Sequence, residues 1–227
     1  MIVHHSDPVT LIGGGNLLKS ELDRALAIGS YLVAADGGAD SAVNHNKIPK
    51  VVIGDFDSIS DTTVATVPKA SQHLITEQKS TDFDKCLRNI SAPLILGIGF
   101  CGGHIDHQLA AFNSLVRHSA TCCVLLGADD VVFLAPPSFR IDLPEGTRVS
   151  LFPFGTVEGH SDGLKWPISG LTFTPDGKVG TSNEATGPVT LSVTAPKLLV
   201  VLPATHFETV AKVLLNTPSH WPSDRNS

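Results

Sequence analysis

The sequence has little positive charge and no run of it. Its 16 Lys and Arg residues are outnumbered by 22 Asp and Glu residues, which gives a formal net charge of −6. Nucleic-acid-binding proteins need clustered Lys and Arg to meet the phosphate backbone. We therefore expect no nucleic-acid partner. An acidic site that binds a phosphate compound would need a metal ion between the two.

Metal-binding cysteine motifs and long apolar segments are also missing. The cysteines have no metal-ligand spacing, so we expect reduced and mostly buried thiols at Cys86, Cys101, Cys122 and Cys123. No Lys or Arg precedes the first apolar run, residues 9–12, and no apolar run is long enough to cross a membrane. These features predict a cytoplasmic protein without a membrane partner.

The first half of the chain alternates short apolar runs with segments of helical period. This alternation predicts an α/β fold, with a mostly parallel sheet sandwiched by helices. The expected strands are residues 9–12, 31–35, 50–54, 73–76, 93–98, 122–126 and 131–134. The expected helices cover residues 17–26 and 39–45, a segment beginning near residue 80, and residues 106–118.

The pattern changes near Pro136-Pro137. Short β-rich runs then follow one another, separated by Gly, Pro, Asn and Asp, and helical period returns only at residues 207–215. This spacing predicts a small antiparallel β-sandwich or partial barrel. Its expected strands are residues 147–152, 155–158, 171–173, 189–193 and 198–202. We therefore expect two domains, residues 1–136 and residues 137–227.

Acidic residues recur where the expected strands end. The apolar run 50–54 leads directly into Asp55 and Asp57, and the other such residues are Asp36, Asp82 and Asp106. Parallel strands present their carboxyl ends at one edge, where ligands of such sheets bind. Two carboxylates about 4 Å apart repel by roughly 4 kcal/mol at an effective dielectric near 20. A solvated loop would explain one motif, but the group predicts a cation, Mg²⁺ or Mn²⁺, and a nucleotide partner.

The segment 80–87 predicts a helix that carries both charge signs on one face. Asp82 and Lys85 point the same way, the first suited to a metal ion and the second to a phosphate. Ser80 or Thr81 can cap this helix, and its free N–H groups favour an anion. The alternative is a capped amphipathic helix with an ordinary surface ion pair.

A glycine turn opens the next helix at Gly102-Gly103-His104-Ile105-Asp106-His107-Gln108. Glycines allow a backbone to approach a ligand closely, and His104 or His107 could donate to a phosphate. Asp106 alone is weak evidence, because an acid in the first turn is also good capping chemistry. Gly13-Gly14-Gly15 has no dinucleotide-binding spacing, and a tight turn explains it nearly as well.

Taken together, these motifs resemble those of the thiamine pyrophosphokinases. The ordered set is Asp36-Gly37-Gly38-Ala39, Gly54-Asp55-Phe56-Asp57-Ser58, Ser80-Thr81-Asp82-Phe83-Asp84-Lys85 and Gly102-Gly103 with Asp106-His107. In the second domain, Gly163-Leu164-Lys165-Trp166 and Thr181-Ser182-Asn183 are similar to that family's C-terminal elements. The resemblance implies an α/β catalytic domain, a C-terminal β-sandwich and a homodimer. It also implies transfer of pyrophosphate from ATP to thiamine, giving thiamine diphosphate and AMP.

The resemblance also implies a role for each matching residue. The catalytic set would be Asp55, Asp57, Asp82 and Lys85, with Mg²⁺ on the three acids. ATP would contact Asp36, Ser80, Thr81, His104, Asp106 and Gln108. Thiamine would contact Trp166, Ser182 and Asn183. The family often has Arg at position 104, and His is only partly charged near neutrality, so weaker nucleotide binding or a shifted pH optimum is expected.

Two other functions fit part of the pattern. A haloacid-dehalogenase-type phosphatase also has an apolar strand ending in Asp-x-Asp, with Asp55 as the nucleophile. That motif usually lies near the start of its domain, however, whereas here it follows the third expected strand. A non-catalytic nucleotide-binding regulator explains the acids but not a separate domain bearing Trp166, unless Trp166 is a core aromatic of the sandwich.

Overall fold

The computed structural model describes residues 1–218 and 220–222; residue 219 and residues 223–227, the end of the second expected domain, lie outside the described residues. The chain divides into two compact units. The first unit comprises Met1–Ser114 with Leu125–Ala128, and the second comprises Leu115–Val124 with Asp129–Ser227. The expected boundary between residues 136 and 137 stays a prediction.

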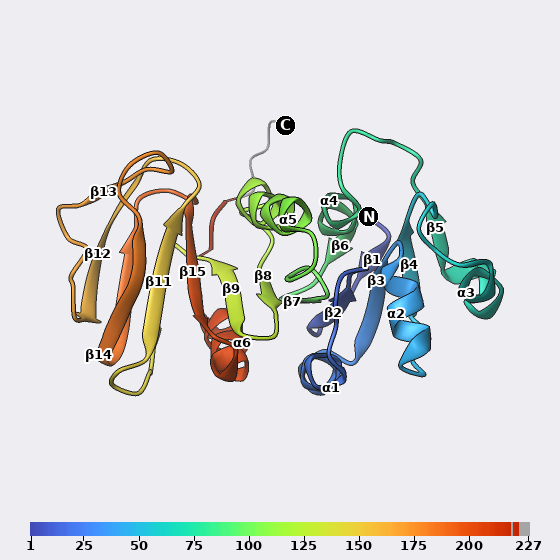
Figure 1. The fold of residues 1–227 in the computed structure, drawn as a ribbon, viewed down its shortest axis with the longest axis horizontal. Helices are drawn as coiled ribbons and strands as arrows, with labels where there is room; N and C mark the ends of the chain where they lie inside the picture. Colours follow the sequence, from blue (N-terminus) through green and yellow to red (C-terminus); the bar gives the residue numbers. More distant parts are fainter. Residues whose placement is uncertain (219, 223–227) are drawn as a thin grey trace. The chain divides into compact units, whose positions relative to one another are not determined.

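A parallel sheet forms the centre of the first unit (Figure 1). Its strand order is β5-β4-β3-β2-β7, and every neighbouring pair is parallel. The strands are β2 (Val9–Ile12), β3 (Tyr31–Ala35), β4 (Val51–Gly54), β5 (Gln72–Leu74) and β7 (Ile95–Ile98). All residues of β2, β4 and β7 are buried, as is typical of parallel strands covered on both faces. Two short strands, β1 (Val3–His4) and β6 (Ile90–Ser91), form a separate parallel pair.

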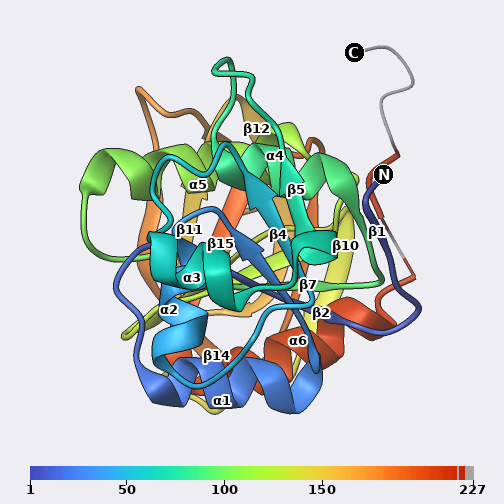
Figure 2. The same cartoon turned by 90° about the vertical axis from the view of Figure 1, so that its right-hand side faces the viewer.

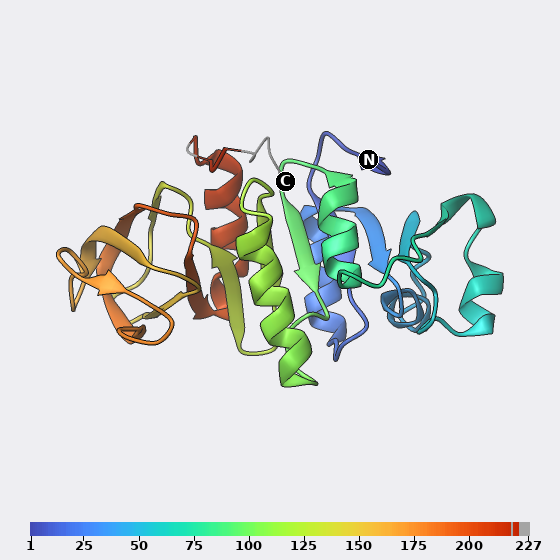
Figure 3. The same ribbon diagram turned by 90° about the horizontal axis from the view of Figure 1, so that it is seen from above.

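Helices cover both faces of this sheet. They are α1 (Lys19–Ile28), α2 (Gly38–Asn44), α3 (Asp61–Thr66), the 3₁₀ turn η1 (Lys69–Ser71) and α4 (Asp82–Asn89). Figure 2 shows α1 and α2 on one face and α4 on the other, while Figures 1 and 3 place α3 beyond the β5 edge. Right-handed crossovers explain this arrangement, because the chain steps from β2 to β5 in one direction and then returns to β7 beyond β2. The order therefore reverses between β2 and β7, which is where such sheets bind ligands.

The second unit is an antiparallel β structure in strand order β13-β12-β14-β11-β15-β9, with β10 also on β14. Its strands are β9 (Asp130–Leu134), β10 (Ser138–Ile141), β11 (Arg148–Pro153), β12 (Val157–Leu164), β13 (Thr172–Phe173), β14 (Gly180–Val193) and β15 (Leu198–Pro203). The long strand β14 pairs with β11 through its first half and with β10 through its second half. Gly187 and Pro188 separate the halves, so one strand serves two layers. The 3₁₀ turn η2 (Ala204–His206) leads into α6 (Phe207–Asn216), which packs on β10.

Two elements cross the division between the units, α5 (Ile105–Arg117) and β8 (Cys123–Leu126). The expected α/β fold class, with an antiparallel C-terminal part, is confirmed. The sequence did not predict β1, β6, β10 or α3, and it predicted only the end of β14. Residues 180–188 escaped because they are polar and half exposed, so their strand form depends on backbone pairing rather than on an apolar run. Within the described residues no helix is long and apolar enough to cross a membrane.

Candidate active site

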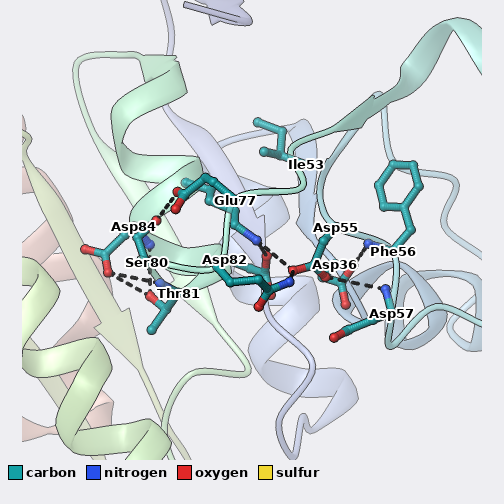
Figure 4. A network of polar contacts seen from close by, with 12 residues as sticks. Asp36, Ile53, Asp55, Phe56, Asp57, Glu77, Ser80, Thr81, Asp82 and Asp84 are labelled. Atoms are coloured by element: carbon teal, nitrogen blue, oxygen red, sulfur yellow. Dashed lines mark hydrogen bonds and ion pairs between the residues drawn. The ribbon is translucent and has the colours of Figure 1, made fainter.

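Three acidic residues meet at the carboxyl edge of the parallel sheet in the first unit (Figure 4). Asp36 follows β3, and Asp55 and Asp57 follow β4. One carboxylate oxygen from each lies within 4.8 Å of the others. Neighbouring parallel strands end at the same edge, which explains how residues far apart in the chain come together here.

A buried lysine connects a fourth acid to this edge. Lys85 on α4 donates hydrogen bonds to Asp55 Oδ2 and to Asp82 Oδ1, both at 2.9 Å. Its side chain is 2% exposed, so the expected alternative of a surface ion pair is wrong. Desolvation alone would lower the pKa of Lys85, but the hydrogen bonds to Asp82 and Asp55 raise it overall. The ammonium group therefore stays charged between the two carboxylates.

The acids of this edge differ in their protonation behaviour. The hydrogen bond from Lys85 lowers the pKa of Asp55. Burial raises the pKa of Asp82, and the nearby Lys85 offsets only part of that effect. Burial likewise raises the pKa of Asp36, against the opposing effect of the backbone N–H groups of Phe56, Ser58 and Gly37. Asp55 therefore loses its proton more readily than an isolated aspartic acid. Asp36 and Asp82 keep theirs more strongly.

Asp57 is the exposed member of the acid group. The Ser58 hydroxyl donates to Asp57 Oδ1 at 2.8 Å, and the backbone N–H of Asp57 points to Asp55 Oδ1 at 3.4 Å. Its exposure leaves Asp57 accessible to an incoming ligand. The acid group offers only oxygen donors, which suits Mg²⁺ or Mn²⁺ better than zinc.

The start of α4 is fixed by a reciprocal cap. Thr81 Oγ1 accepts from the N–H of Asp84 at 3.2 Å, and the N–H of Thr81 donates to Asp84 Oδ2 at 3.3 Å. Of the two expected caps, Thr81 is the one used. Ser80 instead donates to Glu77 and accepts from Arg88 Nη2 at 2.9 Å.

Gln78 is a site residue that sequence reasoning missed. Its Nε2 donates to Asp55 Oδ2 at 2.9 Å, beside the bond from Lys85. Gln78 lies in the loop between β5 and α4, where no periodic pattern exists to reveal it. Neighbouring Glu77 pairs with Arg88 at 2.6 Å and so ties the loop to α4.

Two glycine loops touch at the ends of β2 and β7. The N–H of Gly15 donates to Gly99 O at 2.9 Å, and a Cβ at either Gly13 or Gly15 would lie only 2.7 Å from that oxygen. Gly99 itself has φ +71°. Close backbone packing therefore requires glycine at positions 13, 15 and 99. These loops follow β2 and β7, the strands between which the strand order reverses.

The first turn of α5 carries the remaining residues expected near ATP. Asp106 Oδ1 accepts from the N–H of His107 at 3.0 Å, and Gln108 Oε1 accepts from the N–H of Gly102 at 3.0 Å. His104 is exposed, with its ring 5.7 Å from that of His107. Among the described residues, the group of acids within 4.8 Å contains neither Asp106 nor Asp82.

In the second unit, the three residues expected to bind thiamine lie together. Asn183 Oδ1 accepts from the N–H of Trp166 at 3.2 Å, and Asn183 Nδ2 donates to the Trp166 carbonyl at 2.7 Å. Ser182 has φ +59°, and its backbone N–H donates to Ser150 Oγ at 3.0 Å. Trp166 is 56% exposed, which excludes a core aromatic, and the Lys165 ammonium lies 5.1 Å from its ring.

Family models match both parts of the chain. The model for the thiamin pyrophosphokinase catalytic domain matches residues 22–126, and the model for the thiamin pyrophosphokinase vitamin B1 binding domain matches residues 138–198. The chain belongs to the thiamine pyrophosphokinase family. This membership confirms the resemblance drawn from the motifs.

Individual proteins of the family agree with this assignment. Thiamine pyrophosphokinase 1 of Arabidopsis thaliana is 30% identical over 185 residues, covering 66% of this chain and 69% of that protein. The solved thiamin pyrophosphokinase from Candida albicans has a TM-score of 0.73 at 17% identity and covers 87% of this chain and 89% of its own. That from Bacillus subtilis has a TM-score of 0.69 at 23% identity, with coverages of 86% and 98%. At such identities the structural similarity shows the fold.

Membership of the thiamine pyrophosphokinase family also decides between the enzyme classes considered from the sequence. It confirms an ATP-dependent pyrophosphotransferase of thiamine and does not favour the phosphatase or the non-catalytic regulator.

Proposed function

We propose that this thiamine pyrophosphokinase transfers the pyrophosphoryl group of ATP to the primary hydroxyl of thiamine, giving thiamine diphosphate and AMP. The observation that carries the proposal is the acid group beside buried Lys85, in a chain that matches both domains of the family. Solvated acids on an ordinary loop would not be organised around a buried ammonium.

The reaction requires little covalent chemistry from the protein. The hydroxyl oxygen of thiamine bonds to the β-phosphorus of ATP, while the bond from that phosphorus to the oxygen bridging to the α-phosphorus breaks. AMP leaves with the bridging oxygen, and a carboxylate of the site accepts the hydroxyl proton. If the transition state is loose, charge lies mainly on phosphate oxygens, so positioning and charge neutralisation supply most of the catalysis.

We propose that Asp55, Asp57 and Asp82 hold Mg²⁺. Their oxygen donors fit this ion, which usually takes one or two carboxylates and fills its other positions with water and phosphate oxygens. When bound, Mg²⁺ supplies positive charge that stabilises the phosphate oxygens. Lys85 orients two of these carboxylates, with 2.9 Å hydrogen bonds to both Asp55 and Asp82.

The other proposed contacts follow the family resemblance. On the nucleotide side they are Ser80, Thr81, His104, Asp106 and Gln108. On the thiamine side they are Trp166, Ser182 and Asn183, and the exposed indole of Trp166 suits stacking on a flat cationic ring. We further propose a catalytic domain of residues 1–136, a thiamine-binding and dimer-forming domain of residues 137–227, and a cytoplasmic homodimer.

A product assay tests the proposed reaction. Purified protein is incubated with ATP, Mg²⁺ and thiamine, and the nucleotides are separated by chromatography. We expect AMP to appear in proportion to thiamine diphosphate and only when thiamine is present. ADP or inorganic phosphate as the main product would contradict the proposal.

Asp57→Asn tests whether the acid group carries the reaction. We expect AMP release to be abolished and thermal stability to be retained, since Asp57 is exposed. Asp23→Asn, which removes another exposed carboxylate in the same unit, is the matched control and should keep full activity. Unchanged turnover in Asp57→Asn would remove this residue from the site.

A further inference from the structure

The loop that carries Asp55 and Asp57 has an unfavourable backbone conformation. Phe56, between the two acids, has φ +65°, the left-handed region that a bulky aromatic residue rarely adopts. Such a conformation persists only where the surrounding structure fixes it firmly. In this loop, hydrogen bonds from the backbone amides fix the conformation.

Asp36, directly after β3, and Asp40 on α2 accept hydrogen bonds from every second backbone N–H of this loop. The N–H of Phe56 donates to Asp36 Oδ1 at 2.7 Å, and the N–H of Ser58 donates to Asp36 Oδ2 at 3.1 Å. The next alternate amide, that of Ser60, donates to Asp40 Oδ2 at 3.0 Å. Each oxygen of Asp36 therefore already accepts one backbone hydrogen bond.

The surroundings of Asp36 leave it little freedom. It is 3% exposed, and its own N–H donates to Ile53 O at 2.9 Å, which joins the end of β3 to β4. A Cβ at Gly54 would lie 2.7 Å from Asp36 Oδ1, so the backbone of β4 passes directly against the carboxylate. The Phe56 side chain lines a small apolar pocket with Ala39 and Val52. The loop is thus fixed by its amides and by an aromatic anchor.

We propose that Asp36 is a positioning residue that shapes the metal-binding loop, and not a ligand of the metal or of ATP. The Asp36 carboxylate fixes the backbone at Phe56 and Ser58. It thereby orients Asp55 and Asp57 toward the proposed Mg²⁺ site. Figure 4 shows the ring of Phe56 pointing away from the carboxylate of Asp57. This inference rests on the proposed function for its consequence in catalysis, but its structural part does not.

Amide hydrogen exchange, measured by nuclear magnetic resonance in EDTA without ATP or thiamine, tests the structural part. In the wild-type protein, Phe56 and Ser58 should exchange at least about 10-fold more slowly than unstructured amides, because each donates to a buried charged acceptor. Unprotected Phe56 and Ser58 amides in EDTA would overturn the proposal even if every variant failed to fold.

Asp36→Asn then links the protection to the carboxylate. Asparagine keeps one acceptor oxygen and turns an NH₂ group toward the other amide, so at least one of the two amides should exchange at least about 10-fold faster. Asp57→Asn should leave both amides protected, and Asp40→Asn should affect Ser60 alone. Unchanged exchange at both Phe56 and Ser58 in a folded Asp36→Asn protein would overturn the proposal.

The dependence of AMP release on Mg²⁺ concentration tests the catalytic part. A misplaced loop should raise the Mg²⁺ concentration for half-maximal activity of Asp36→Asn by at least about 10-fold, whereas a loss of folded protein alone would lower kcat without moving that concentration. An unchanged Mg²⁺ dependence would contradict the positioning role. Because the exchange experiment uses no substrate, a protein that makes no AMP at all would contradict the proposed function and leave the structural part standing.

Discussion

Lys85→Met removes the buried ammonium group and keeps a side chain of similar length. In the wild-type protein this group lies 2.9 Å from Asp55 Oδ2 and 2.9 Å from Asp82 Oδ1, and its side chain is 2% exposed. The substitution leaves two carboxylates facing one another with no cation between them. We expect a large loss of stability that depends on divalent metal.

The size of the loss follows from these distances. Since both oxygens lie 2.9 Å from one nitrogen, they are no more than about 5.8 Å apart. At an effective dielectric near 20, two unit charges at that distance or closer repel by at least about 3 kcal/mol. Removing one partner of a buried ion pair costs about 3–5 kcal/mol in general. For a chain of this size, a loss of about 3–5 kcal/mol lowers the melting temperature by roughly 6–20 °C.

Thermal and urea denaturation in EDTA and in excess Mg²⁺ measure this effect. Mg²⁺ should recover part of the loss, because a divalent cation near the acids offsets the same repulsion. The control is Lys19→Met, which removes an exposed partner of Asp23 and should change the free energy of unfolding by less than about 0.5 kcal/mol. A Lys85→Met protein that melts within about 2 °C of the wild type in EDTA would refute the reasoning.

Two further predictions concern Glu77 and Trp166. Hydrogen bonds from Ser80 and Arg88 lower the pKa of Glu77 to about 2 from its ordinary 4.5, so ionised Glu77 stabilises the folded state above pH 4.5 and loses this contribution as the pH falls toward 2. The difference in melting temperature between wild type and Glu77→Gln should therefore be largest above pH 4.5 and vanish near pH 2; a difference that grows with acidity would contradict the assignment. Trp166→Ala should raise KM for thiamine by about 2- to 30-fold, more than KM for ATP, and leave the melting temperature unchanged, since the indole is 56% exposed. Phe152→Ala, another exposed aromatic in the second unit, is its control, and equal changes in both KM values would argue against stacking.

The sequence predicted the parallel strands and the acids at their ends for one physical reason. Strands such as β2 and β4 are buried on both faces, so they read as continuous apolar runs, and a polar residue directly after them marks the edge of the sheet. The same reason explains the failure at residues 180–188 of β14, where alternating exposed residues carry no apolar signal.

The contacts within the site were less predictable, because they depend on distances between separate segments. Periodicity placed Asp82 and Lys85 on one helix face. It could not reveal that Asp55, directly after β4, reaches the same ammonium, or that the Lys85 side chain is buried. Gln78 lies in a loop without periodicity, and only the folded structure brings it to Asp55. The burial of Lys85 distinguishes this ion pair from a surface ion pair, and burial is a property of the whole fold.

The acids of this edge have one residue type and three different environments. Asp36 faces two backbone amides, Asp55 and Asp82 share an ammonium, and Asp57 faces solvent with a hydroxyl from Ser58. An acid whose oxygens are occupied by amides has less capacity left for a metal ion than one that is exposed. Asp57 is therefore the acid for which the structure offers the least internal role, and a bound cation would give its charge a function. A motif that records only the letters cannot separate these roles, whereas the internal partners of each carboxylate can.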